Sequence, residues 1–255
     1  MRATKWLAPA LAVILLLAAW QAYVELDSVS RFVLPSPAEV LTSLVTDRHT
    51  LWVNFRVTAE ELLCGISLAS ITGLLVAVGL HFSGAAVRRA LYPLLVASQA
   101  VPIPIVAPLL IVWLGFGLAP KLVVIALVCF FPIVLTTLSG LETVDKELLR
   151  LLETFDAGTW QTFCRVELPW ALPGLFTGAK LAAVLSVIAA VLAEQSGSNQ
   201  GLGYLLVVTI SNLETAEAFA SVLVLAAFAI LLFAAITLIE RHTLPWIYRP
   251  TGTEN

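Results

Sequence analysis

The chain has 255 residues, of which 60% are hydrophobic and 12% are charged, and its formal net charge is −3. Soluble globular domains carry charges at about a quarter of their positions, so this composition excludes a soluble domain and indicates an integral membrane protein. The small net charge gives no reason to expect nucleic-acid binding. Cys64, Cys129 and Cys164 show no paired spacing, so we expect free thiols.

Six apolar runs are long enough to cross a bilayer, because a helix rises about 1.5 Å per residue through about 30 Å of hydrocarbon. They are residues 6–24, 62–82, 90–113, 122–141, 172–193 and 219–239. The first also fits a signal peptide, since Arg2 and Lys5 precede it, but no small-residue cleavage pattern follows. We therefore expect an all-α integral membrane fold of six transmembrane helices, with a retained anchor helix in residues 1–30.

The Lys and Arg residues indicate which side the termini occupy. With a cytoplasmic N-terminus, nine of them lie on the cytoplasmic side, four lie outside, and Lys180 lies in a span. The nine are Arg2, Lys5, Arg88, Arg89, Lys146, Arg150, Arg165, Arg241 and Arg249, and the four are Arg31, Arg48, Arg56 and Lys121. We expect cytoplasmic termini, with residues 246–255 as a cytoplasmic tail.

The segments expected outside the membrane contain recognisable local patterns. The sequence Leu34-Pro35-Ser36-Pro37 predicts a rigid extended stretch, followed by a short interfacial helix at residues 38–45. The glycine-rich residues 196–203 lack the GK[ST] ending of a nucleotide-binding loop, so no ATP site is expected in this chain.

The third apolar run contains four prolines: Pro93, Pro102, Pro104 and Pro108. Each removes a backbone donor and clashes with the preceding turn, so we expect a broken helix. Broken membrane helices often line solute pathways, which makes Ser98, Gln99 and Pro102 candidate pathway residues. The alternative is that Ser98 and Gln99 only satisfy the loosened backbone.

Several charges lie in or beside the apolar runs. Lys180 is expected either to extend to the cytoplasmic headgroups, or to face an internal cavity or pair with a carboxylate. Glu194 is too far along the same span to pair with Lys180, so it lines an outer mouth or marks the interface. Glu60, at the start of the second run, is expected to form an exposed pair with Arg56.

Residues 146–173 form a polar segment that predicts two short amphipathic helices. The first carries an apolar stripe of Leu148, Leu149, Leu152 and Phe155, and the second carries Trp160, Phe163 and Val166. These stripes either fit a groove on a partner protein or cover the ends of the protein's own helices.

The same segment keeps the frame of a known signature, Glu-Ala-Ala, three residues, Gly, nine residues, Ile, any residue, Leu-Pro. Arg150-Leu151-Leu152, Asp156, Val166 and Leu168-Pro169 occupy its positions. Further stretches that match are LPSP, LVASQAVPIPIVAPLLIVWLGFG at 95–117, FFPIVLTTLSGLETVD at 130–145, WQTFCRVELPWALPGLFTGAK at 160–180 and AEQSGSNQGLGYLL at 193–206. From about residue 34 to 246 the chain resembles the permease subunits of bacterial ATP-binding-cassette (ABC) importers of the nitrate/taurine/sulfonate type. Within that family, its sequence most resembles the branch for thiamine-pyrimidine precursors (hydroxymethylpyrimidine).

The resemblance implies a type I importer permease fold in the bacterial inner membrane, with a permease core at 31–245 and a cytoplasmic coupling loop at 142–170. It implies a cytoplasmic ATPase dimer that binds ATP and Mg²⁺, a second permease copy, and a periplasmic or lipid-anchored solute-binding protein. The expected cargo is a small polar solute, a pyrimidine thiamine precursor or alternatively a sulfonate, taurine, nitrate or riboflavin. The residues implied in ATPase coupling are Arg150, Leu151, Leu152, Phe155, Asp156, Gly158, Trp160, Phe163, Val166, Leu168 and Pro169.

The chain departs from the signature at two positions. Asp156 replaces the glycine of the turn, and we expect the turn to shift toward Gly158. Arg150 replaces the acidic first residue, which predicts an acidic counterpart on the ATPase. A polytopic membrane enzyme is the alternative class, but the sequence has no HExxH, no GxSxG and no paired intramembrane Asp, so we expect a transport subunit and no enzyme.

Overall fold

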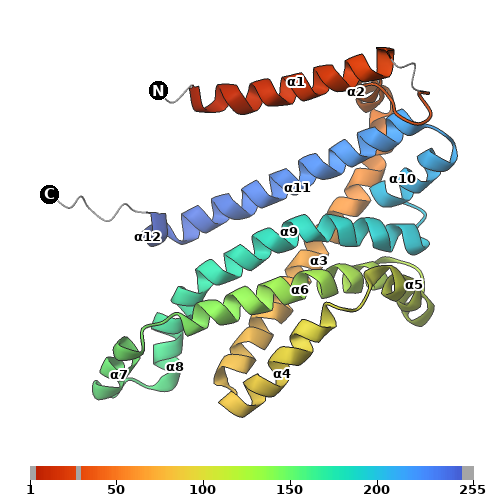
Figure 1. Ribbon diagram of the computed structural model, residues 1–255. Helices are drawn as coiled ribbons and strands as arrows, with labels where there is room; N and C mark the ends of the chain where they lie inside the picture. Colours follow the sequence, from red (N-terminus) through yellow and green to blue (C-terminus); the bar gives the residue numbers. More distant parts are fainter. Residues whose placement is uncertain (1–3, 27–29, 249–255) are drawn as a thin grey trace. The chain divides into compact units, whose positions relative to one another are not determined.

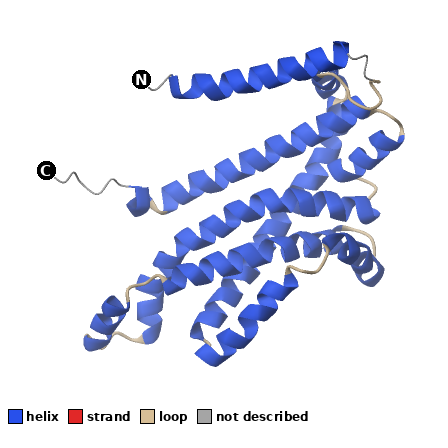
Figure 2. Cartoon of the chain, in the orientation of Figure 1, coloured by secondary structure: helices blue, strands red, loops and turns tan. Residues whose placement is uncertain are grey.

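A computed structural model describes residues 4–26 and 30–248 of the chain. Every regular element in these ranges is helical, as predicted (Figures 1 and 2). In chain order the elements are α1 (Thr4–Leu26), α2 (Pro37–Thr46), α3 (Arg48–Phe82), α4 (Ala85–Ser98), α5 (Ile103–Leu114), α6 (Leu118–Glu142), α7 (Lys146–Thr154), α8 (Thr159–Thr162), the π-helix η1 (Phe163–Glu167), α9 (Leu168–Gly197), α10 (Leu202–Ser211), α11 (Thr215–Thr243) and α12 (Pro245–Tyr248).

Four helices in the described ranges are long and apolar enough to cross a membrane: α3, α6, the continuous run through α8, η1 and α9, and α11. The bent pair of α4 and α5 makes a fifth if it counts as one span. The apolar parts of α1 and α10, Leu11–Leu26 and Leu202–Ser211, are shorter. The chain is therefore a multi-pass helical membrane protein, and the count of six spans stays a prediction.

The third apolar run is broken, as its prolines predict. α4 and α5 meet at 94° (Figure 1), and the break lies between Ser98 and Ile103. Pro102 is the N-cap of α5, and Pro104 lies in its first turn. Because neither proline can donate a backbone hydrogen bond to the preceding turn, α5 starts as a new helix.

Two helix boundaries correct the sequence-based expectations. α3 begins at Arg48, well before the apolar run, so Glu60 and Glu61 lie inside the helix. Arg56 and Glu60 are both exposed and form no ion pair in the part of the chain that the structure describes. α6 begins at Leu118, so the expected outer-loop residue Lys121 lies in this helix and is buried.

Contacts divide the chain into two compact units, residues 1–58 with 199–227, and residues 59–198 with 228–255. In the first unit, α2 has the predicted position and a full capping box between Ser36 and Glu39. α3 caps α10 in the same unit, because Asn54 Oδ1 accepts from the Gly201 N–H and Thr58 Oγ1 accepts from the Leu202 N–H, both at 2.8 Å. The division into anchor, core and tail stays a prediction, and residues 249–255 of the tail lie outside the described residues.

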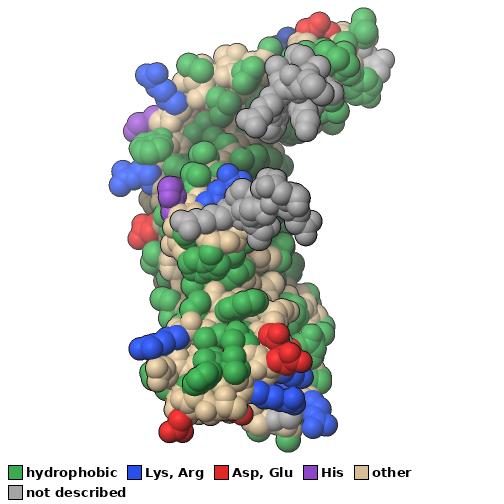
Figure 3. All heavy atoms as spheres, turned by 90° about the vertical axis from the view of Figure 1, so that its left-hand side faces the viewer, with side chains coloured by type: hydrophobic (Ala, Val, Ile, Leu, Met, Phe, Trp, Pro, Cys, Tyr) green, Lys and Arg blue, Asp and Glu red, His purple; other side chains and the backbone are tan. Residues whose placement is uncertain are grey.

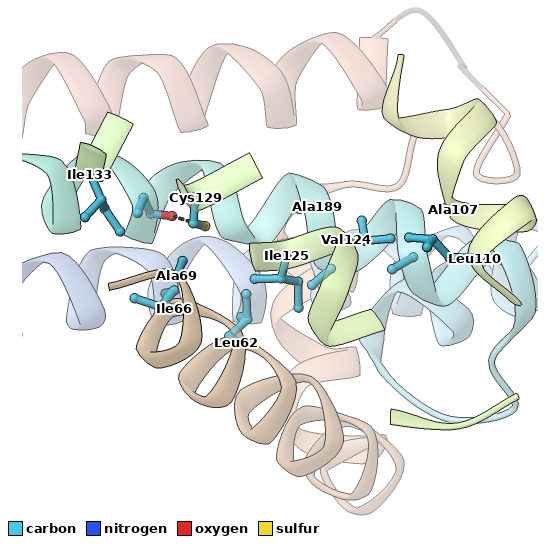
Figure 4. Packing of buried hydrophobic residues seen from close by; sticks show 13 residues of the cluster. Leu62, Ile66, Ala69, Ala107, Leu110, Val124, Ile125, Cys129, Ile133 and Ala189 are labelled. Carbon is cyan, nitrogen blue, oxygen red and sulfur yellow. Dashed lines mark hydrogen bonds between the residues drawn. The ribbon is translucent and has the colours of Figure 1, made fainter. Parts of the chain in front are cut away.

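The second unit is built around the close packing of α6 and α9. An ideal Cβ on Gly174 would lie 2.2 Å from the Thr136 carbonyl oxygen, and one on Gly178 would lie 2.4 Å from Thr136 Oγ1. Only glycine allows the two backbones to approach this closely, as small residues four apart do in membrane helix pairs. The core beside this contact is apolar (Figure 4) and joins α3, α5, α6 and α9 through Leu62, Ile66, Ala69, Ala107, Leu110, Val124, Ile125, Cys129, Ile133, Ala182, Ala189, Ala190 and Ala193.

Candidate functional site

The predicted amphipathic segment forms a helical hairpin made of α7 and α8. Asp145 caps α7 by accepting from the Glu147 N–H at 2.8 Å. α7 ends at Thr154, its C-cap is Phe155, and Asp156 follows with a φ of 57°. The Asp156 N–H donates to the Glu153 carbonyl at 3.0 Å and the Ala157 N–H donates to the Leu152 carbonyl at 3.1 Å, which together make a Schellman motif.

The predicted shift of this turn to Gly158 is therefore wrong. Gly158 has an ordinary φ of −62° and is the N-cap of α8. The left-handed position stays at Asp156, where the signature has glycine. Aspartate can hold it because its short polar side chain tolerates this conformation better than most residues do.

The apolar side chains of the hairpin divide into an exposed and a buried set. Phe155 is 75% exposed, Trp160 is 69% exposed and Leu151 is also exposed. By contrast, Phe163 is 3% exposed and packs with Leu141 and Ala171. Phe163 therefore covers the end of the protein's own helices, and contact of the exposed side chains with a partner stays a prediction.

The other residues predicted for coupling differ in how exposed their side chains are. Arg150 is exposed, whereas Leu152, Val166, Leu168 and Pro169 are half-buried. On the face drawn in Figure 3, hydrophobic side chains lie among basic and acidic ones. We define the coupling surface as Leu151, Phe155 and Trp160; its role stays a prediction.

The second helix of the hairpin continues directly into a helix that is long and apolar enough to cross a membrane. α8, η1 and α9 form one helical run, Thr159–Gly197. Its π-helical part is tied to the end of α3, because His81 Nε2 lies 3.1 Å from Glu167 Oε2 and the Phe82 and Phe163 ring centroids are 4.9 Å apart. π-helical turns are rare and often lie at functional sites. Trp160 and α9 thus belong to one continuous helical run within the second unit.

The candidate pathway residues do not form one site. Ser98 and Gln99 end α4 at the break, where the Ser98 hydroxyl donates to the Leu95 carbonyl at 2.7 Å, and Pro102 begins α5. Lys180 Nζ donates to Glu240 Oε2 at 2.9 Å. The expected alternative of carboxylate pairing is therefore the one observed for Lys180.

Glu194 is buried in a second polar cluster. It lies beside Glu61, whose Oε1 accepts from Lys121 Nζ at 2.5 Å, and Lys121 also donates to Ser198 Oγ at 2.8 Å. These contacts join α3, α6 and α9 through buried charges. Sequence reasoning missed this cluster because it assigned Lys121 to an outer loop; a lysine within one turn of an apolar run was the available signal.

A cavity of about 1170 Å³ lies among α4, α6, α9 and α12 in the second unit. None of the five candidate pathway residues lines it. Its lining combines aromatic rings, hydroxyl groups and an ion pair, in which Arg88 Nη1 lies 2.7 Å from Glu142 Oε1. The polar and aromatic side chains of the lining include Arg88, Tyr92, Thr136, Ser139, Glu142, Thr143, Trp170, Thr177 and Trp246.

Comparison with known proteins identifies the family. Residues 69–247 match the family described as "Binding-protein-dependent transport system inner membrane component". The chain belongs to this family. The match covers the broken helix pair, the hairpin and the cavity.

Three relatives show what this family member resembles. A probable ABC transporter permease protein of Haemophilus influenzae is 35% identical, over 90% of this chain and 94% of its own length. The formylaminopyrimidine transport permease protein ThiX of Halalkalibacterium halodurans is 32% identical, over 96% and 98%. The riboflavin transport system permease protein RibX of Chloroflexus aurantiacus is 35% identical, over 91% and 87%.

The chain is therefore the permease component of a binding-protein-dependent ABC transporter. Permease subunits of this kind are not enzymes. Membership in the family implies partnership with an ATPase and a solute-binding protein. The resemblance drawn from the signature frame, including its likeness to the pyrimidine branch, is confirmed.

Proposed function

We propose that this permease imports a small polar solute, driven by ATP hydrolysed in a separate ATPase dimer that holds the ATP and Mg²⁺. The observation that carries the proposal is the coupling surface, which presents exposed Leu151, Phe155 and Trp160 on a hairpin that is continuous with α9. Apolar anchors of this size carry much of the free energy of a protein interface when a partner groove buries them.

The proposed assembly has two permease copies in the bacterial inner membrane, with cytoplasmic termini and hairpins. A periplasmic or lipid-anchored binding protein delivers the solute to the outer side. The Lys and Arg distribution supports this orientation, because Lys146 and Arg150 lie in the hairpin and Arg165 lies just after it.

The proposed solute is a pyrimidine precursor of thiamine. The identity with the formylaminopyrimidine permease over nearly the full length of both chains supports this choice. A sulfonate, taurine, nitrate or riboflavin is the alternative. Selection among them depends on the binding protein as well as the permease.

The test is uptake into proteoliposomes that contain the permease, its cognate ATPase and its solute-binding protein. We expect accumulation of a radiolabelled aminopyrimidine that requires ATP on the ATPase side and stops when the binding protein is left out. Taurine, nitrate and riboflavin serve as parallel cargoes. Accumulation without ATP would contradict the energy source, and accumulation of taurine in place of the pyrimidine would contradict the cargo.

A further inference from the structure

The cavity among α4, α6, α9 and α12 has a lining that favours a polar occupant. Its wall follows α6 and its C-cap from Leu135 to Thr143, and α9 from Pro169 to Thr177. Each stretch corresponds to about 12 Å of helix. Hydroxyl groups occur along both stretches, and a lipid tail would offer no donor to the lone pairs of their oxygens.

Three hydroxyl groups of this wall have acceptor capacity left for an occupant. The Thr136 hydroxyl donates to the Pro132 carbonyl at 2.8 Å, Thr143 donates to the Gly140 carbonyl at 2.7 Å, and Thr177 donates to the Pro173 carbonyl at 2.8 Å. A hydroxyl has one proton, and here each proton is used within its own helix. The oxygens therefore offer lone pairs to an occupant that carries N–H or NH₂ donors.

Aromatic rings supply the other part of the lining. Trp170 is 52% exposed and Trp246 is 55% exposed, and Tyr92 is also exposed. Such rings stack on flat heterocycles through offset or edge contacts. Two basic side chains, Arg88 and Arg89, also line the cavity, and the ion pair of Arg88 with Glu142 partly neutralises the charge of Arg88.

We propose that this cavity holds the transported solute on the cytoplasmic half of its path, and that it selects a flat heterocycle bearing amino donors over an acceptor-only oxyanion. Threonine oxygens accept from the amino group while Trp170 and Trp246 contact the ring. The inference rests on the proposed import function and assigns specificity to the permease itself, in addition to the binding protein.

The experiment measures solute protection of a cysteine placed in the cavity. Ser139→Cys is introduced together with Cys64→Ser and Cys164→Ser, which removes the two exposed native thiols. The complete transporter is reconstituted, and labelling by a membrane-permeant maleimide is timed with 4-aminopyrimidine, pyrimidine or taurine. We expect 4-aminopyrimidine to slow labelling by about fivefold, and pyrimidine and taurine to leave it unchanged.

Matched variants assign the effect to the cavity. Thr177→Val removes one acceptor and should weaken protection by 4-aminopyrimidine about threefold to tenfold, the range for one hydrogen bond. Thr237→Val removes a hydroxyl with the same bond to its own helix, at 2.8 Å to the Phe233 carbonyl, but outside the cavity. This control should leave protection unchanged.

Each other outcome overturns the inference. Equal labelling with and without every solute would show that the cavity binds none of them. Protection by taurine alone would reverse the selectivity, and slowing by added phosphatidylglycerol in place of solute would identify a lipid site. Loss of ATP-dependent uptake in the unmodified transporter would instead contradict the proposed function, so the two failures are distinguishable.

Discussion

Asp156 is the residue on which the geometry of the hairpin depends. Its φ of 57° lies in the left-handed region, where a β-branched residue is strained by roughly 1–2 kcal/mol and glycine is not. The signature frame locates this position, but the letter at that position suggested a displaced turn. The turn is not displaced, because the Schellman hydrogen bonds of α7 require a left-handed residue directly after Phe155.

We therefore predict opposite effects for two substitutions at this position. Asp156→Gly should keep transport and raise stability by up to about 1 kcal/mol, whereas Asp156→Val should destabilise the hairpin by about 1–2 kcal/mol. Limited proteolysis of the loop in the assembled transporter measures this directly. Ala157→Val, at a residue without positive φ, is the control. Faster cleavage of Asp156→Gly than of Asp156→Val would contradict the prediction.

Lys180 and Glu240 join α9 and α11 by a mostly buried ion pair within the second unit. Glu240→Gln should lower the free energy of unfolding by about 1–3 kcal/mol, because it leaves a lysine in an apolar span without its counter-charge. The double variant Lys180→Met with Glu240→Gln should recover part of that loss. Thermal unfolding of the purified permease in detergent gives the comparison. Strictly additive effects of the two single changes would show that the pair has no coupling energy.

At the scale of elements, the sequence predicts what local rules decide. The interfacial helix α2 has its predicted position because its capping box lies within four residues, and the proline-rich run breaks where its prolines require it. Local rules do not predict which side chains of distant elements come into contact. Lys121 and Glu61 are 60 positions apart, and only the packing of α3 against α6 brings them together.

The candidate site shows the same division. The hairpin and its apolar stripes were predicted from periodicity, but the separation of exposed Phe155 from buried Phe163 was not, because it depends on contacts with Leu141 and Ala171. The π-helix was also missed, since its apolar spacing in sequence resembles that of an α-helix. The cavity could not be predicted because four elements form it.

The contact of α6 with α9 predicts a glycine-specific effect. Gly174→Ala would place a Cβ 2.2 Å from the Thr136 carbonyl oxygen, so the helices must separate, at a cost of about 1–3 kcal/mol. Gly79→Ala is the matched control, because it lies inside α3 and no atom lies within 4 Å of its added Cβ. Thermal unfolding in detergent should show a lower midpoint for Gly174→Ala alone. Equal midpoints for the two variants would contradict the close packing.

At the scale of the whole molecule, the sequence has no GK[ST] nucleotide-binding motif, and we propose that a partner supplies the work of transport. The family match covers residues 69–247, and the hairpin lies inside that range. Trp160 belongs to the same helical run as the α9 residues that line the cavity, so one continuous helix joins part of the surface proposed to contact the ATPase to the site proposed for the solute. The central claim is that the coupling surface transmits ATPase motion to α9.

The most direct measurement of that claim is the number of solute molecules imported per ATP hydrolysed in proteoliposomes containing the complete transporter. Phe155→Asp and Trp160→Asp should insert normally but lower this ratio at least about tenfold, because a charge in an apolar groove costs more than about 1.4 kcal/mol. Phe155→Leu, which keeps an apolar anchor, should retain most of the ratio. An unchanged ratio in both aspartate variants would contradict the claim.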